Sequence, residues 1–171
     1  MEGRKMKYES LIPMCMTAAL CTFSHAGSIV VDGTLDADYG DANTLQNTQT
    51  AFGDSTLGLP DFANGSELDS GHVIIDGGMM YIMLTGNLES TFNKVDVFID
   101  ARDGGQNILR SDNPDVDYDG LNRMGDDGSG NGLTFDNGFD ADFWVSLTCG
   151  GKEFATYGAA AELRTTGGGT G

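Results

Sequence analysis

The residues most suggestive of chemistry lie in an Asp- and Gly-rich segment at residues 112–132, DNPDVDYDGLNRMGDDGSGNG. Within it, Asp115, Asp117, Asp119 and Gly120 stand at relative positions 1, 3, 5 and 6, and Asp126 stands at position 12. These are the offsets of a calcium loop of the EF-hand type, with Asp in place of the bidentate Glu. Alternate residues of a curling loop can direct hard carboxylate oxygens at one centre. The sequence therefore predicts a Ca²⁺ site at Asp115, Asp117, Asp119 and Asp126.

The residues around this loop argue against a complete EF-hand. Pro114 lies directly before it and a Gly-rich run follows it, so no flanking helices are expected. The prediction is a helix-free Asp loop that binds Ca²⁺ on a β scaffold. The alternative is a solvated turn without an ion, because short Asp patterns recur by chance in a very acidic chain. A second pattern, Asp127, Ser129, Asn131 and Gly132, either shares ligands with the first or forms a turn.

Aromatic residues suggest a second class of ligand, a polysaccharide, because sugar rings stack on exposed aromatic side chains. The candidate contacts are Tyr118, Arg123 and Trp144. Tyr118 lies between two Asp residues and is expected to be exposed, whereas Trp144 lies in a predicted strand, where packing is the alternative. Arg102, Arg110 and Arg123 border the acidic loop and can instead pair with its carboxylates. Tyr39, Tyr81 and Tyr157 are weaker candidates.

No catalytic constellation is evident. His72 is the only histidine after residue 26, which disfavours a zinc site rich in histidine and a Ser-His-Asp triad. Cys149 is expected to be a small packed residue. Many carboxylates are available for glycoside hydrolysis, but no pair is singled out. We expect no enzyme and no catalytic residues.

Short apolar runs separated by Asp, Asn and Gly clusters predict antiparallel strands joined by turns. Gly77-Gly78 predicts a tight hairpin, and Gly150-Gly151 predicts a second one. Such a pattern is typical of an all-β protein, an antiparallel β-sandwich of jelly-roll type with little helix and long Asp/Gly-rich loops. The segment from Asp41 to Asp69 is polar and has no clear period. The expected strands are Ser28–Val31, His72–Asp76, Met79–Thr85, Lys94–Asp100, Asp142–Cys149 and Lys152–Tyr157.

The start of the chain has the order of a secretory signal peptide. Arg4, Lys5 and Lys7 precede an uncharged, mainly apolar run from Leu11 to Phe23, and Ser24-His25-Ala26 follows it. This run is short for a bilayer span and contains Pro13. We expect residues 1–26 to be removed after Ala26 and the protein to be secreted or held at the cell envelope. An uncleaved N-terminal anchor is the alternative, and no integral membrane segment is expected after signal removal.

The remaining residues, 27–171, suit a single β-sandwich domain. The whole chain has a formal net charge of −17, and residues 27–171 contain 24 acidic and six basic residues. This charge argues against nucleic acid and anionic membranes as partners and suits divalent cations. Cys149 would be the only cysteine left, so no disulfide is expected within the chain. The last residues, GGGTG, resemble the opening of a loop, and we expect the chain to be truncated at the C-terminus.

Two sets of motifs resemble known families. VDGTLDADYG at residues 31–40, together with MYIMLTGNL and VDVFIDARDGG, resembles the strands of β-sandwiches that are like carbohydrate-binding-module family 9 and DOMON domains. This resemblance implies a jelly-roll-like, non-catalytic module that binds sugar or haem, with calcium in some members. The paired sugar-clamping tryptophans of the sugar-binding members have no counterpart, because Trp144 is alone.

The stretch NPDVDYDGLNRMGDDGSGNGLTFDNGF resembles large exported bacterial proteins of unknown function that end in a PEP-CTERM sorting tail. That tail is absent from this chain. The resemblance implies delivery to the cell envelope or the extracellular matrix. Taken together, the sequence predicts a secreted or envelope-associated, non-catalytic β-sandwich protein that binds Ca²⁺ and a polysaccharide. The alternatives are a fragment of a carbohydrate-active enzyme and a purely structural matrix protein.

Overall fold

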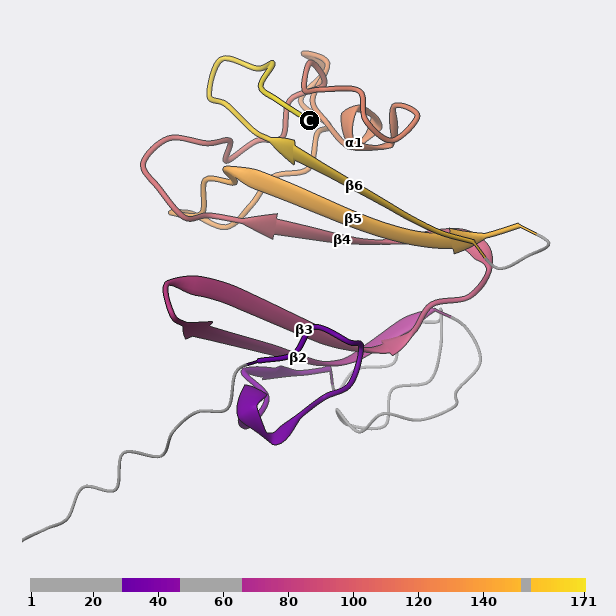
Figure 1. The fold of residues 1–171 in the computed structure, drawn as a ribbon. Helices are drawn as coiled ribbons and strands as arrows, with labels where there is room; N and C mark the ends of the chain where they lie inside the picture. Colours follow the sequence, from indigo (N-terminus) through magenta and orange to yellow (C-terminus); the bar gives the residue numbers. More distant parts are fainter. Residues whose placement is uncertain (1–28, 47–65, 152–154) are drawn as a thin grey trace, which may run out of the picture.

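The computed structural model describes residues 29–46, 66–151 and 155–171, which form two antiparallel sheets of three strands each (Figure 1). The first sheet has the strand order β1-β2-β3, and the second has the order β4-β5-β6. Two short helices complete these parts of the chain, a 3-10 helix η1 and an α-helix α1. The all-β, low-helix prediction is confirmed. The bounds are η1 Ala37–Tyr39, β1 Thr44–Leu45, β2 Glu67–Asp76, β3 Met79–Asn87, β4 Thr91–Ile99, α1 Gly120–Arg123, β5 Phe143–Gly150 and β6 Ala155–Glu162.

The hairpin predicted at Gly77-Gly78 joins β2 to β3. Asp76 pairs with Met79 across the turn, and the two glycines have φ values of 57° and 82°. Only glycine adopts two consecutive positive φ values at little cost, so this dipeptide fixes the register of the pair. β2 begins at Glu67, before the expected start at His72. A bulge between Leu68 and Ser70 interrupts the regular pairing of β2 with β3.

Most of the other predicted strands are found with shifted ends, and one is not found. Residues 152–154, where the last predicted strand begins, lie outside the described residues, and β6 is described from Ala155. β5 pairs with β4 on one side and with β6 on the other, and Gly150 still belongs to β5 opposite Ala155. The strand expected at Ser28–Val31 was wrong for the residues described, 29–31, which form no strand. Only Ile29 is buried there, whereas Val30 and Val31 are exposed, so this run does not pack as one face of a sheet.

The hydrophobic core lies on one face of the second sheet, beneath the long Asp/Gly-rich segment that joins β4 to β5. Trp144 of β5 is fully buried, and its neighbours across the sheet are Phe98 of β4 and Ala161 of β6. The segment supplies Leu109 and Leu121, which are both fully buried in the same cluster. The long acidic segment is therefore anchored in the core by a few apolar residues.

The opposite face of the second sheet looks toward the first sheet, and apolar side chains on both facing surfaces stay partly exposed. Val145 and Leu147 alternate with Trp144 along β5 and are 38% and 47% exposed. On the first sheet, Val73 and Ile75 of β2 are 43% and 74% exposed. The two-layer arrangement agrees with the predicted sandwich, but a buried sandwich core between the sheets is not confirmed.

The N-terminal described segment covers the other face of the first sheet. The Nδ1–H of His72 donates to the carbonyl of Gly40 at 3.2 Å, and its Nε2 lies 3.1 Å from Ser70 Oγ. Both side chains are buried. His72 therefore fixes the segment around η1 to β2. The predicted signal peptide and most of the polar stretch from Asp41 to Asp69 lie outside the described residues.

Candidate functional site

The predicted calcium loop is built between the second sheet and α1, and its two ends are fixed. Leu121, in the first turn of α1, is fully buried in the core. Asn113, directly before the loop, exchanges two hydrogen bonds with Asn122, directly after it. The backbone N–H of Asn113 donates to Asn122 Oδ1 at 2.9 Å, and Asn122 Nδ2 donates to the Asn113 carbonyl at 2.9 Å. Residues 114–121 are thus held as a closed loop.

Inside the loop, two consecutive non-glycine residues curl the chain. Tyr118 and Asp119 have φ values of 58° and 69°, in the left-handed region that Asp tolerates better than Tyr. The backbone N–H of Asp119 donates to Asp115 Oδ1 at 2.7 Å, which closes the turn. The positive φ values fall on Tyr118 and Asp119, and Gly120 has none. A Cβ at Gly120 would meet the Asp117 carboxylate and Lys94 Nζ, so a larger residue here would displace the contact between these two side chains.

The prediction of a helix-free loop is wrong, because α1 begins at Gly120. The N–H of Leu121 donates to both Asp117 carboxylate oxygens at 3.1 Å, which directs this carboxylate toward the start of α1. A turn of helix can form because Asp117 satisfies one of the donors that a helix leaves unpaired at its start.

A lysine from the sheet reaches the same carboxylate. Lys94 of β4 places Nζ 2.5 Å from Asp117 Oδ2 and 3.4 Å from the Asp117 backbone carbonyl oxygen. The Asp117 side chain is only 6% exposed, and that of Lys94 is 30% exposed. One carboxylate oxygen and one carbonyl oxygen of the loop are therefore already directed at a positive charge.

The four predicted ligands are not gathered around one centre. The exposed Asp119 carboxylate lies 3.5 Å from Arg123 Nε. Asp126 Oδ1 accepts the N–H groups of Gly128 and Gly130 at 3.1 and 2.7 Å, within its own turn. Across residues 29–46, 66–151 and 155–171, no group of three or more His, Cys, Asp or Glu side chains is arranged to hold a metal ion.

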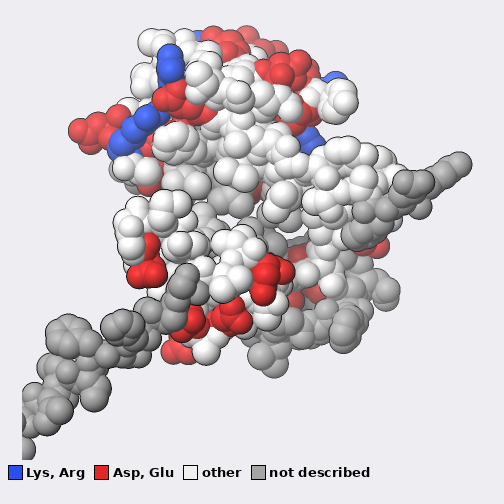
Figure 2. Space-filling view, in the orientation of Figure 1, with Lys and Arg blue, Asp and Glu red and all other residues white. Residues whose placement is uncertain are grey.

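Two acidic side chains at the margins of the loop have lowered pKa values. A hydrogen bond from Arg110 lowers the pKa of Asp112, and Arg110 Nε and Nη2 both reach this carboxylate, at 2.8 and 2.6 Å. Hydrogen bonds from Ser129 lower the pKa of Asp127. Figure 2 shows acidic side chains gathered over this part of the molecule, with basic side chains among them.

The three candidate polysaccharide contacts fall in different environments. Tyr118 is 98% exposed, as expected, and the exposed Arg123 side chain contacts the neighbouring residue Asp119. The prediction of Trp144 as a polysaccharide contact is wrong, because its ring is fully buried and its Nε1–H donates to Asp96 Oδ1 at 3.0 Å. Its position on the core face of β5 removes it from any surface where a sugar could stack.

Sequence reasoning missed the residues that hold the loop: Lys94, Asn113 and Asn122. Lys94 is distant in sequence, and only the pairing of β4 with β5 brings it beneath the loop. Asn113 is partly foreseeable, because an Asn before a proline commonly begins a turn. It is buried and linked to the buried Gln106, whose Nε2 donates to Asn113 Oδ1 at 2.7 Å.

Comparisons with protein-family models, curated proteins and solved structures found no match to this chain. Within the described parts of the chain, no helix has the length and apolar character needed to cross a membrane.

Proposed function

We propose that the protein is an exported, non-catalytic β protein of the cell envelope or extracellular space that binds Ca²⁺ through the Asp115–Asp119 loop. The observation that carries this proposal is the contact of Lys94 with the loop, because Asp117 directs a carboxylate and a carbonyl oxygen at one cation. Both are hard oxygen ligands of the kind that Ca²⁺ prefers. Asp115 and Asp119, on the same curled loop, supply further carboxylates after side-chain rotation.

Binding of Ca²⁺ in this form requires the ion to replace the Lys94 ammonium at Asp117. A divalent ion gains more from several carboxylates than one ammonium does, but it must also remove a partly buried ion pair. The expected affinity is therefore modest, in the range of about 10⁻⁴–10⁻³ M that extracellular modules use. Export to a medium containing millimolar calcium would be enough to fill such a site.

A polysaccharide is the second proposed ligand, supported by the exposure of Tyr118 and of the Arg123 side chain. An exposed ring and a guanidinium on a loop can stack on a sugar and donate hydrogen bonds to its hydroxyl groups. Binding on a glycan array without turnover would support this proposal. Release of reducing sugar by the protein would favour the carbohydrate-active enzyme instead.

Calorimetric titration with Ca²⁺ tests the calcium proposal. We expect saturable binding to the wild type and loss of that binding in Asp117→Asn, which removes the charge with little change in shape. Asp103→Asn is the matched control, because Asp103 is an exposed acid outside the loop. Equal binding by the two variants would refute the assignment of the site. A wild type that takes up no calcium would refute the function.

A further inference from the structure

Strand β3 has a neighbouring strand on one side only. It pairs with β2 from Met79 to Asn87 and stands at the end of the strand order β1-β2-β3. Within the described parts of the chain, β2 is the element against which β3 packs, and no backbone hydrogen bond joins residues 79–86 to any other segment. None of the nine residues of β3 is buried. The outer side of β3 is therefore an open sheet edge.

The hairpin determines which backbone groups point outward from this edge. The two residues that flank a two-residue turn form a hydrogen-bonded pair, so the N–H and C=O of Met79 face Asp76 on β2. Hydrogen-bonded and non-hydrogen-bonded pairs then alternate along the two strands. No register shift interrupts the pairing up to Leu84. The N–H and C=O groups of Met80, Ile82 and Leu84 therefore point away from β2 in a row.

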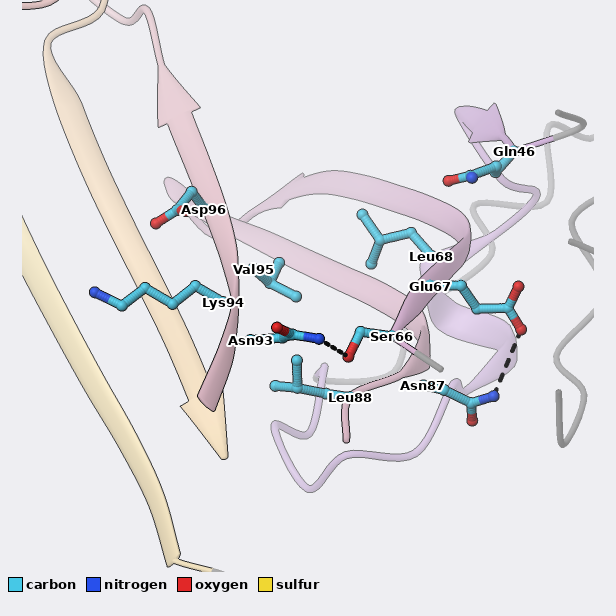
Figure 3. A pocket seen from close by; sticks show the side chains of 10 residues that line it. All are labelled: Gln46, Ser66, Glu67, Leu68, Asn87, Leu88, Asn93, Lys94, Val95 and Asp96. Carbon is cyan, nitrogen blue, oxygen red and sulfur yellow. Dashed lines mark hydrogen bonds between the residues drawn. The ribbon is translucent and has the colours of Figure 1, made fainter. Parts of the chain in front are cut away.

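Two of the other edge strands have features that discourage pairing with a further strand, and β3 lacks them. Natural proteins make edge strands very short, interrupt them with bulges, or place charged residues and proline on them. β1 has only two residues. β4 carries Lys94 and Asp96, which line a pocket of about 510 Å³ (Figure 3), and its pairing with β5 is irregular after Thr91. Residues 79–87 include no charged residue and no proline.

The remaining edge strand, β6, is less suited to pairing than β3. Its residues 155–161 are mostly alanine and glycine, which have low β propensity. At its end, the N–H of Glu162 donates to the carbonyl of Thr170 at 2.8 Å, so the C-terminal segment already covers the edge there. In contrast, β3 contains Tyr81, Ile82 and Thr85, which favour strands. β3 is therefore the edge best suited to pair with another strand.

We propose that β3 pairs with β3 of a second copy of this chain, antiparallel and across a two-fold axis at Ile82. A two-fold interface uses the same surface on both copies. With Ile82 on the axis, its N–H and C=O meet those of Ile82 in the second copy, and those of Met80 meet Leu84 of the second copy. All the outward backbone groups of these residues then have partners. The two three-stranded sheets become one sheet of six strands.

The uncharged character of β3 favours a second copy over a charged peptide. Pairing of the strand with itself sets no like charges opposite one another, because residues 79–87 carry none. Met80 and Ile82 are 45% and 36% exposed, and pairing would remove part of their apolar surface from water. The net charge of −17 opposes approach of the two copies, and salt screens this repulsion. Dimerisation should therefore strengthen as salt is added, whereas binding of a basic peptide would weaken.

Sedimentation velocity of the full chain at several protein concentrations tests this proposal. We expect an equilibrium between monomer and dimer whose dissociation constant falls as NaCl is raised from about 0.05 to 0.5 M. Ile82→Lys should weaken dimerisation at least about tenfold, because it sets two ammonium groups opposite one another. Val73→Lys is the matched control, which should dimerise like the wild type. Val73 pairs with Ile82 and is 43% exposed, but it lies on the central strand β2.

Ile82→Pro gives a second test, because it removes an outward N–H and leaves the hydrogen bonds between β2 and β3 in place. We expect this variant to be monomeric, with circular dichroism confirming that it is folded. Equal dimerisation in Ile82→Lys and Val73→Lys, or a dimer that weakens as salt is added, would overturn the proposal. A wild type that is monomeric at every concentration would also overturn it, and any strand at this edge would then come from another protein.

Discussion

Lys94 is the residue on which the proposed calcium site depends most closely. Its ammonium neutralises the Asp117 carboxylate, which is only 6% exposed, and it approaches from a strand distant in sequence. In the absence of calcium this contact ties the loop to β4. In the presence of calcium the same ammonium is a competitor. Lys94 thus stabilises the calcium-free protein and opposes the binding of calcium.

Substitution Lys94→Gln should therefore change stability and calcium affinity in opposite directions. Without calcium, we expect a loss of up to about 1 kcal/mol in the free energy of unfolding, as for other partly exposed ion pairs. With the competitor removed, calcium affinity should rise by up to about fivefold. Thermal unfolding with chelator and calorimetry with Ca²⁺ measure the two effects.

Lys94→Arg keeps the positive charge and serves as the control for this substitution. Its calcium affinity should stay closer to that of the wild type than the affinity of Lys94→Gln does. If calcium affinity is the same in the wild type and in Lys94→Gln, the ammonium and the ion do not compete, and the site lies elsewhere.

At the scale of elements, the loop is held by the pairing of Asn113 with Asn122 and by the burial of Leu121. Asn122→Ala removes both hydrogen bonds between the ends of the loop, and each such bond contributes about 0.5–1.5 kcal/mol. We expect the free energy of unfolding to fall by about 1–3 kcal/mol in denaturant titrations. Calcium affinity should also fall, although no carboxylate is changed.

Asn131→Ala is the matched control for Asn122→Ala, because the Asn131 side-chain amide donates to Ser129 Oγ in an exposed turn outside the loop. It should leave both stability and calcium affinity close to those of the wild type. A loss of calcium affinity that is equal in both variants would mean that the ends of the loop do not organise the site.

The sequence predicted the elements better than it predicted their packing. Gly77-Gly78 and the alternation in KVDVFID were sufficient for β3 and β4, because turn chemistry and period-two patterns are local. The core was not foreseen, since Leu109 and Leu121 are isolated apolar residues within an acidic segment. The role of Gly120 and the approach of Lys94 depend on contacts between distant segments, which no local pattern reports.

At the scale of the whole molecule, acid should weaken a cluster of ion pairs at the end of β6. Hydrogen bonds from Arg102 and then Arg164 lower the pKa of Glu162 from its ordinary value of 4.5. A carboxyl group whose folded-state pKa is lowered stabilises the protein above its ordinary pKa, and this contribution is lost as the pH falls through the folded-state value. The Arg102 and Arg164 side chains are about half exposed, so solvent screens these contacts and the effect should be small.

Glu162→Gln isolates this contribution from the general repulsion among acidic groups. The variant should be slightly less stable than the wild type at neutral pH. The difference should shrink as the pH falls below the ordinary pKa of 4.5 and disappear once Glu162 is protonated in the folded protein. Chemical unfolding at several pH values measures it. A stability difference that does not change with pH would show that the Arg102 and Arg164 contacts do not depend on the charge of Glu162.

The distribution of charge favours binding of a cation. Acidic groups gather over the Asp/Gly-rich segment, where a cation would reduce their repulsion. Calcium binding should raise stability by an amount set by the ratio of its concentration to Kd, about 2.7 kcal/mol at a hundredfold excess over Kd.

Luminescence of terbium, a luminescent substitute for Ca²⁺, tests the central claim most directly, because Tyr118 lies within the loop and can transfer excitation energy to an ion bound there. With excitation of tyrosine, the wild type should show terbium emission that Ca²⁺ abolishes. Asp117→Asn should lose this emission because it no longer binds the ion. Tyr118→Phe should lose the emission while still binding Ca²⁺ in calorimetry. Emission that is equally strong in Asp117→Asn, or that Ca²⁺ does not displace, would contradict a calcium site at Asp115–Asp119.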